Sequence, residues 1–110
     1  MAELFEELHR FVVPRLHRRE RHLIPAVEGV YVIINQKNGG VEYVGQSIDV
    51  RNRILTHQMP WARLLPEYAD DFSALVFPVD GETERKSLEK KMIMALRPRL
   101  NIQWNVTTIL

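Results

Sequence analysis

The fold is decided by GVYVIIN at residues 29–35, NGG at 38–40 and VEYVG at 41–45. The first stretch is rich in β-branched residues and has the length of a strand that is buried on both faces. Asn and Gly accept positive φ at little cost, so residues 38–40 predict a tight turn. The third stretch then returns as a second strand, and the three segments together predict a β-hairpin.

Helices are expected on both sides of this hairpin along the chain. Residues 3–20 carry apolar side chains at three-to-four spacing, which predicts a helix with a kink at Pro14. After the hairpin, Ser47 is the expected N-cap of a helix over residues 48–57.

A third strand and a last helix complete the prediction. Residues 72–79 favour a strand whose end is marked by Pro78, and Asp80 is the expected cap of a helix that Pro98 ends. We therefore expect an α+β fold, a small three-stranded antiparallel sheet flanked by helices with an extra N-terminal helix.

Length and composition bound the class of protein. At 110 residues the chain has room for one domain over 1–110, which we divide into an N-terminal helical extension at 1–25 and a core at 29–101. The absence of cysteine excludes disulfides and thiolate metal sites. The apolar runs are too short to span a bilayer, and the acidic N-terminus does not resemble a secretion signal. These features predict a cytoplasmic protein without a membrane partner.

The net charge of +1 is only mildly basic and does not by itself indicate nucleic acid. The basic residues gather in three runs, namely Arg15, Arg18, Arg19 and Arg21 with His17 and His22; Arg85, Lys86, Lys90 and Lys91; and Arg97 and Arg99. A single run of this kind is typical of a solvated face. Phosphate contact becomes the better interpretation only if a nuclease site lies nearby.

Three groups of residues are candidates for chemistry, and each has an ordinary structural interpretation. Tyr31 and Tyr43 stand on the two arms of the hairpin, where paired tyrosines most often pack across strands. Arg53 and His57 are four apart on one helix face, where they would bind phosphate and move a proton or simply be solvated. Glu89 has apolar neighbours that suggest partial burial and a metal, although Lys90 and Lys91 also fit an exposed patch.

The ordered set of these residues resembles the GIY-YIG nuclease family. The resemblance rests on GVY at 29–31, YVGQS at 43–47, Arg53 with His57, Leu88-Glu89, and PRLN at 98–101. It covers about two thirds of the chain, from Gly29 to Asn101, and within the family it is similar to the N-terminal nuclease domain of excinuclease C.

The resemblance implies a divalent-metal-dependent endonuclease that hydrolyses phosphodiester bonds in DNA. It implies Mg²⁺ or Mn²⁺ as the cofactor, with Glu89 as the metal's direct protein ligand. Arg53 would clamp a phosphate oxygen and one tyrosine would assist proton removal from water, with Tyr31 preferred for the water and Tyr43 for support. The implied catalytic residues are Tyr31, Tyr43, Arg53, His57, Glu89 and Asn101, of which Asn101 has a structural or phosphate-positioning role.

One departure from the family pattern is Gln46, where many members have a basic residue. The expected nucleic-acid contacts are Arg15, Arg18, Arg19, Arg21, Gln46, Lys90, Arg97 and Arg99. Because the chain has no separate recognition domain, a structure-directed or weakly sequence-specific DNA nuclease is the better interpretation. The alternatives are a non-cleaving nucleic-acid-binding module and a nuclease that a partner protein targets. Leu4, Phe5, Leu8 and Phe11 of the N-terminal helix are expected to pack against the domain, and the alternative is that they form the interface with a second copy or a partner protein.

Overall fold

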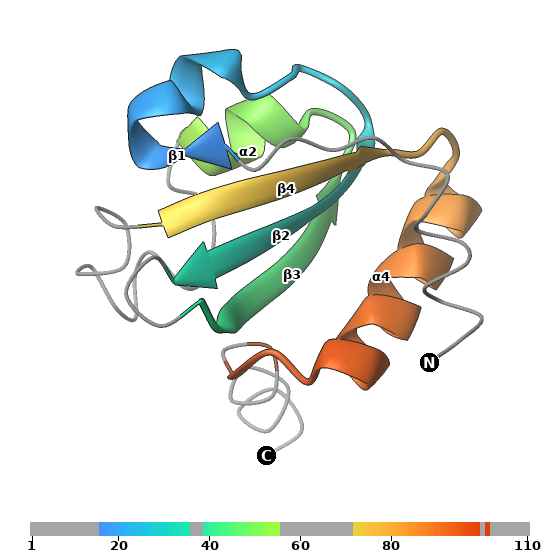
Figure 1. Cartoon of the computed structure of the whole chain (residues 1–110). Helices are drawn as coiled ribbons and strands as arrows, with labels where there is room; N and C mark the ends of the chain where they lie inside the picture. Colours follow the sequence, from blue (N-terminus) through green and yellow to red (C-terminus); the bar gives the residue numbers. More distant parts are fainter. Residues whose placement is uncertain (1–15, 36–38, 56–71, 100, 102–110) are drawn as a thin grey trace.

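Antiparallel strands in the order β1-β4-β2-β3 form the sheet of the protein in the computed structural model (Figure 1), which describes residues 16–35, 39–55, 72–99 and 101. The three long strands are β2 (Gly29–Asn35), β3 (Val41–Ser47) and β4 (Phe72–Pro78). The three-stranded antiparallel sheet expected from the sequence is therefore confirmed. A two-residue strand, β1 (Leu16–His17), pairs with β4 and adds a short fourth strand at that edge of the sheet.

The β2–β3 hairpin has the register that matters for the site. Tyr31 lies opposite Gly45, Val32 opposite Val44 and Ile33 opposite Tyr43. At the turn, Gly39 has a φ of 72°, and its N–H donates to the Asn35 carbonyl at 2.8 Å. The glycine thus supplies the positive φ that the sequence predicted for this turn.

The sheet is covered on both faces, as the uniform burial of β2 requires. Tyr31 and Ile33 pack on one face against Val50 and Ile54 of α2 (Val50–Leu55). On the other face a second apolar cluster joins the sheet to α4 (Glu82–Leu96); its buried members are Val30, Val32, Ile34, Val44, Phe77, Leu88 and Met92. Figure 1 shows α2 and α4 on different sides of the hairpin.

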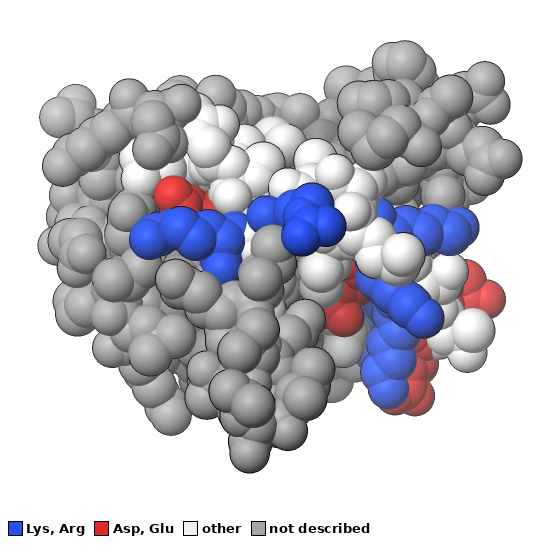
Figure 2. All heavy atoms as spheres, turned by 90° about the horizontal axis from the view of Figure 1, so that it is seen from below, with Lys and Arg blue, Asp and Glu red and all other residues white. Residues whose placement is uncertain are grey.

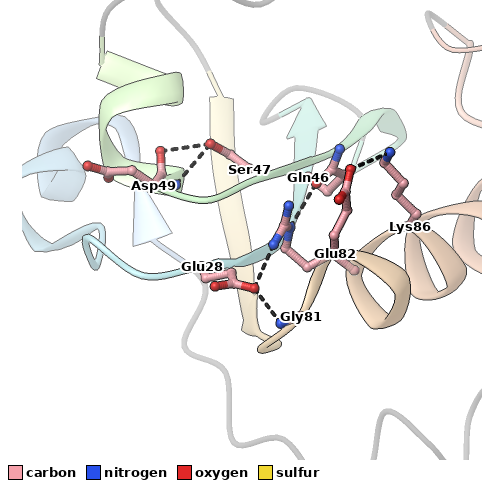
Figure 3. Close-up of polar contacts among 8 residues, drawn as sticks. Glu28, Gln46, Ser47, Asp49, Gly81, Glu82 and Lys86 are labelled. Carbon is pink, nitrogen blue, oxygen red and sulfur yellow. Dashed lines mark hydrogen bonds and ion pairs between the residues drawn. The ribbon is translucent and has the colours of Figure 1, made fainter.

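Two helix starts differ from the prediction. The cap of α2 is Asp49 instead of Ser47, since Asp49 Oδ1 accepts the N–H of Asn52 at 3.0 Å. Ser47 Oγ instead accepts the N–H of Asp49 at 3.0 Å and shapes the turn before the helix (Figure 3). The helix α4 begins after Gly81, whose φ is 96° and which has no side-chain cap, so Asp80 is not the cap.

The N-terminal helix expected over residues 3–20 is wrong where the structure describes it. Residues 16–17 form β1, and a 3-10 helix, η1 (Arg18–Leu23), follows. The reason is tertiary, because Leu16 pairs with Ala74 and His17 with Ser73 of β4, and such pairing overrides a local helical pattern. Residues 3–15, with the apolar side chains expected at an interface, lie outside the described residues.

Within the described ranges there is no helix with the length and apolar character needed to cross a bilayer.

Candidate active site

Tyr31 and Tyr43 lie on the same face of the hairpin. Their ring centroids are 6.1 Å apart and the ring planes are inclined by 40°. The register explains this arrangement, since Tyr43 faces Ile33 and residues two apart on a strand point to the same side. Both phenols therefore lie on one surface of the hairpin.

Gly45 leaves room for the phenol of Tyr31. A Cβ added at Gly45 would lie 2.5 Å from Cζ of Tyr31 and still nearer to its hydroxyl oxygen. Any side chain at residue 45 would therefore push the ring of Tyr31 aside. The glycine is required here for close approach, and its φ is not positive.

A side-chain hydrogen bond connects the two phenols. Burial is the main reason why the pKa of both tyrosines is raised above the ordinary value. The hydrogen bond raises the pKa of Tyr31 further and lowers that of Tyr43. The hydrogen bond therefore favours the anion of Tyr43 over that of Tyr31.

Arg53 and Glu89 act on this pair from two different helices. For Tyr43, Glu89 is the largest cause after burial and raises the pKa, whereas Arg53 lowers it. The same two groups act on the pKa of Tyr31 in the same directions. Side chains from β2, β3, α2 and α4 are therefore close enough to interact electrostatically at one place.

The Glu89 carboxylate fits a metal ligand. It is half-buried, and burial raises its pKa, while Lys86 one turn earlier lowers it. No described residue forms an ion pair or a hydrogen bond with it. Among the described residues no three His, Cys, Asp or Glu side chains cluster. A hard cation that keeps several water ligands suits such a site.

Asn101 is buried against the outer edge of β3. Its Oδ1 accepts the N–H of Val44 at 2.7 Å, and its Nδ2 donates to the Val44 carbonyl at 2.8 Å. Among the described strands β3 has no neighbour on this side, so these bonds satisfy backbone groups that a further strand would otherwise pair. Of the two roles expected for Asn101, this geometry matches the structural one.

No protein-family model matches the chain. UvrABC system protein C of Caldicellulosiruptor saccharolyticus is 33% identical over 84 residues, which cover 72% of this chain and 14% of that protein. The protein of the same name from Bradyrhizobium diazoefficiens is 34% identical over 89 residues, 77% of this chain and 13% of that protein. The chain thus spans about one seventh of the length of these relatives.

A solved structure matches both in fold and in sequence. It is a point mutant of the GIY-YIG N-terminal endonuclease domain of UvrC from Thermotoga maritima, bound to its catalytic divalent cation. The TM-score is 0.55 at 29% identity, and the match covers 76% of this chain and 91% of that one. The chain is a GIY-YIG-like domain. This similarity supports a nuclease.

Two expected site residues of the GIY-YIG-like domain lie outside its described part, namely the catalytic candidate His57 and the nucleic-acid contact Arg15. Arg18, Arg19 and Arg21 belong to η1, but only their backbone is described.

The expected contacts that are described differ in their surroundings. Lys90 and Arg97 are exposed, and Arg99 Nε pairs with the buried Glu42 at 3.1 Å. Figure 2 shows basic side chains in a broken row across the face seen from below, with acidic ones beside them. The positive charge of this GIY-YIG-like domain is therefore partly neutralised at the surface.

Arg85 of the GIY-YIG-like domain forms two contacts that were not predicted, one with Glu28 and one with Gln46. Arg85, expected to be part of a solvated basic run, is buried and pairs with Glu28 at 2.5 Å. It also donates from Nε to Gln46 Oε1 at 2.9 Å. The available signal was its spacing, because Arg85 stands four residues before Glu89 on the side of α4 that faces the sheet.

Proposed function

We propose that this chain is a divalent-metal-dependent endonuclease that hydrolyses phosphodiester bonds in DNA. The observation that carries the proposal is the meeting of the tyrosine pair with Arg53 and Glu89 at one edge of the sheet. The similarity to UvrC, whose domain was solved with its catalytic divalent cation, supports the same assignment. Mg²⁺ or Mn²⁺ is the proposed cofactor.

Each group has a role that its surroundings suit. Glu89 would hold the cation, which supplies Lewis-acid stabilisation of the phosphate when bound. Arg53 would donate hydrogen bonds to a non-bridging phosphate oxygen and offset the charge of the transition state. His57 would orient a tyrosine or shuttle its proton.

The hydrogen bond between the phenols bears on the choice of base. The bond lowers the pKa of Tyr43 and raises that of Tyr31, so it favours the Tyr43 anion. We therefore assign proton removal from the attacking water to Tyr43 and the supporting role to Tyr31. This assignment reverses the preference drawn from the sequence. Arg53 favours the anion, and so does any cation placed at Glu89, because positive charge lowers the pKa of a phenol.

We propose that the protein binds DNA through contacts with the phosphate backbone of the DNA. Lys90 and Arg97 are exposed basic residues on and just after α4, and Arg99 keeps part of its guanidinium accessible beside Glu42. Together with Arg15, Arg18, Arg19, Arg21 and Gln46 they would contact the phosphates. Such contacts position a substrate without reading its bases, which fits structure-directed or weakly sequence-specific cutting.

The deciding experiment is nicking of supercoiled plasmid with Mg²⁺ or Mn²⁺ by wild type and Glu89→Gln. Glu84→Gln is the matched control, since Glu84 is an exposed acid on the same helix. We expect Glu89→Gln to stay folded and lose cleavage, while Glu84→Gln cuts like the wild type. Cleavage by Glu89→Gln would overturn the metal role. Binding of DNA without cutting of plasmid or branched DNA would instead favour a binding module or a nuclease that depends on a targeting partner.

A further inference from the structure

Arg85 connects three segments that are distant in the sequence. Its Nη1 pairs with Glu28 Oε1 at 2.5 Å, and its Nε donates to Gln46 Oε1 at 2.9 Å. The same Glu28 oxygen accepts the backbone N–H of Gly81 just before α4. Figure 3 shows this arrangement between the start of β2, the end of β3 and the first turn of α4. We call the contacts of Glu28, Arg85 and Gln46 the Arg85 bracket.

Stability alone does not explain the bracket, because removing two charged side chains from water costs free energy. The Arg85 side chain is 8% exposed and that of Glu28 30% exposed, so both charges are largely removed from water. Desolvation of such a pair often cancels its attraction, and apolar replacements of similar volume are often as stable. What an ion pair with two directional arms provides in addition is a fixed geometry.

Each member of the bracket lies next to a group of the site. Glu28 precedes Gly29 and the strand that carries Tyr31, and Gln46 follows Gly45, over which the Tyr31 phenol lies. Arg85 and Glu89 are one turn apart on the same side of α4. The bracket therefore joins the strand ends beside the tyrosines to the helix turn beside the carboxylate.

We propose that Arg85 is a positioning residue, which fixes α4 so that Glu89 faces the tyrosine pair. This inference rests on the proposed nuclease function, since it assigns a purpose to that geometry. Arg85 itself is held by Glu28 and Gln46 and does not contact the reacting atoms. A displacement of about 1 Å at a catalytic group can lower a rate by a factor of about 100, so a loosened bracket should reduce turnover strongly.

The test uses a double variant that removes the charges and keeps the space filled, Glu28→Gln/Arg85→Met. Gln at residue 28 can still accept the N–H of Gly81. The matched control is Glu84→Gln/Lys91→Met, which makes the same kinds of change at exposed positions of α4. We expect the double variant to fold, and its single-turnover nicking at saturating Mn²⁺ to fall by about 100-fold. The control should stay near the wild-type rate.

A second variant guards against failure to fold. Arg85→Lys keeps the charge beside Glu28 but lacks the guanidinium fork that also reaches Gln46. It should give an intermediate loss of rate at saturating Mn²⁺. Wild-type rates in both variants would overturn the inference.

A readout without cleavage separates this inference from the proposed function. The chain has no cysteine, so Asn52→Cys on α2 and Met94→Cys on α4 provide two sites for spin labels. We expect the distance distribution between them to shift or broaden in Glu28→Gln/Arg85→Met and not in the control. An unchanged distribution would overturn the positioning role even if the wild type cuts no substrate, and a changed one would support it in that case too.

Discussion

The phenol of Tyr31 lies over Gly45 on the neighbouring strand, in space that a Cβ would fill. This contact sets the position of Tyr31 relative to Tyr43, with which it forms a hydrogen bond. The sequence at residue 45 thus controls a distance in the candidate active site.

Gly45→Ala should therefore displace Tyr31 and damage both folding and activity. Overpacking of this kind costs about 1–3 kcal/mol of unfolding free energy, and we expect nicking per folded molecule to fall at least tenfold. Urea unfolding and plasmid nicking measure the two effects. Gly39→Ala is the control, because it strains a positive φ in an open turn and should cost about 1 kcal/mol without loss of rate. A fully active Gly45→Ala would contradict the proposed importance of the contact.

Replacing Tyr31 and replacing Tyr43 should change the pH dependence of the nicking rate in different ways. Tyr43→Phe removes the proposed base and should abolish the rise of the nicking rate with pH. Tyr31→Phe removes the hydrogen bond that lowers the pKa of Tyr43, so the rising limb should move to higher pH. Single-turnover rates across the alkaline range measure this. An unshifted profile for Tyr31→Phe would argue against Tyr43 as the base.

Glu89 should make the stability depend on pH in a known direction. Burial raises its pKa in the folded protein above the unfolded value, so the folded state binds more protons between these two values. Stability is therefore lost as the pH rises through this window. Glu89→Gln, which stays neutral, should unfold at a higher temperature than the wild type at pH 7, with the difference vanishing near pH 4. Equal behaviour at both pH values would contradict the burial of the charge.

Addition of metal should reverse the order of the unfolding temperatures of the wild type and Glu89→Gln at pH 7. A cation that binds the folded wild type at ten times its Kd adds about 1.4 kcal/mol of stability. Mn²⁺ should thus raise the unfolding temperature of the wild type at pH 7 and leave Glu89→Gln unchanged. Equal stabilisation of both proteins would place the metal elsewhere.

The contribution of α4 to DNA binding should show in the salt dependence. Lys90 is about 100° around the helix from Glu89, on the side of Lys86, whereas Lys91 is about 160° away on the other side. Lys90→Gln should lower the slope of log K against log salt by about 0.9, the value for one phosphate contact. Lys91→Gln is the matched control and should leave the slope unchanged. Equal effects of the two would indicate a diffuse attraction.

The sequence predicted the fold best where a single segment contains the whole signal. The bounds of β2 were predicted to the residue, because a β-branched run of strand length ends at a turn. The side chain of Pro78 marked the end of β4 for a similarly local reason, since proline has no N–H to donate. The shared face of Tyr31 and Tyr43 was left open by the sequence and is given by the register of the hairpin in the structure.

Features that depend on distant partners were missed. β1 has two residues and no periodicity of its own, and it exists through pairing with Ala74 and Ser73. The contacts of Arg85 join residues 57 and 39 positions away, so in the sequence it looked like its exposed neighbours. The cap of α2 moved from Ser47 to Asp49 because a side-chain turn precedes the helix, and both residues are good caps.

The two hydrogen bonds of Asn101 also affect how the molecule meets its own copies. An open strand edge invites a strand of another chain, and proteins block such edges to avoid joining into extended sheets. On β3, as far as the described residues show, an amide side chain obstructs the edge and occupies the N–H and C=O of Val44 as an added strand would. The residue that holds the candidate site's strand in place thereby also protects that strand from edge-to-edge aggregation.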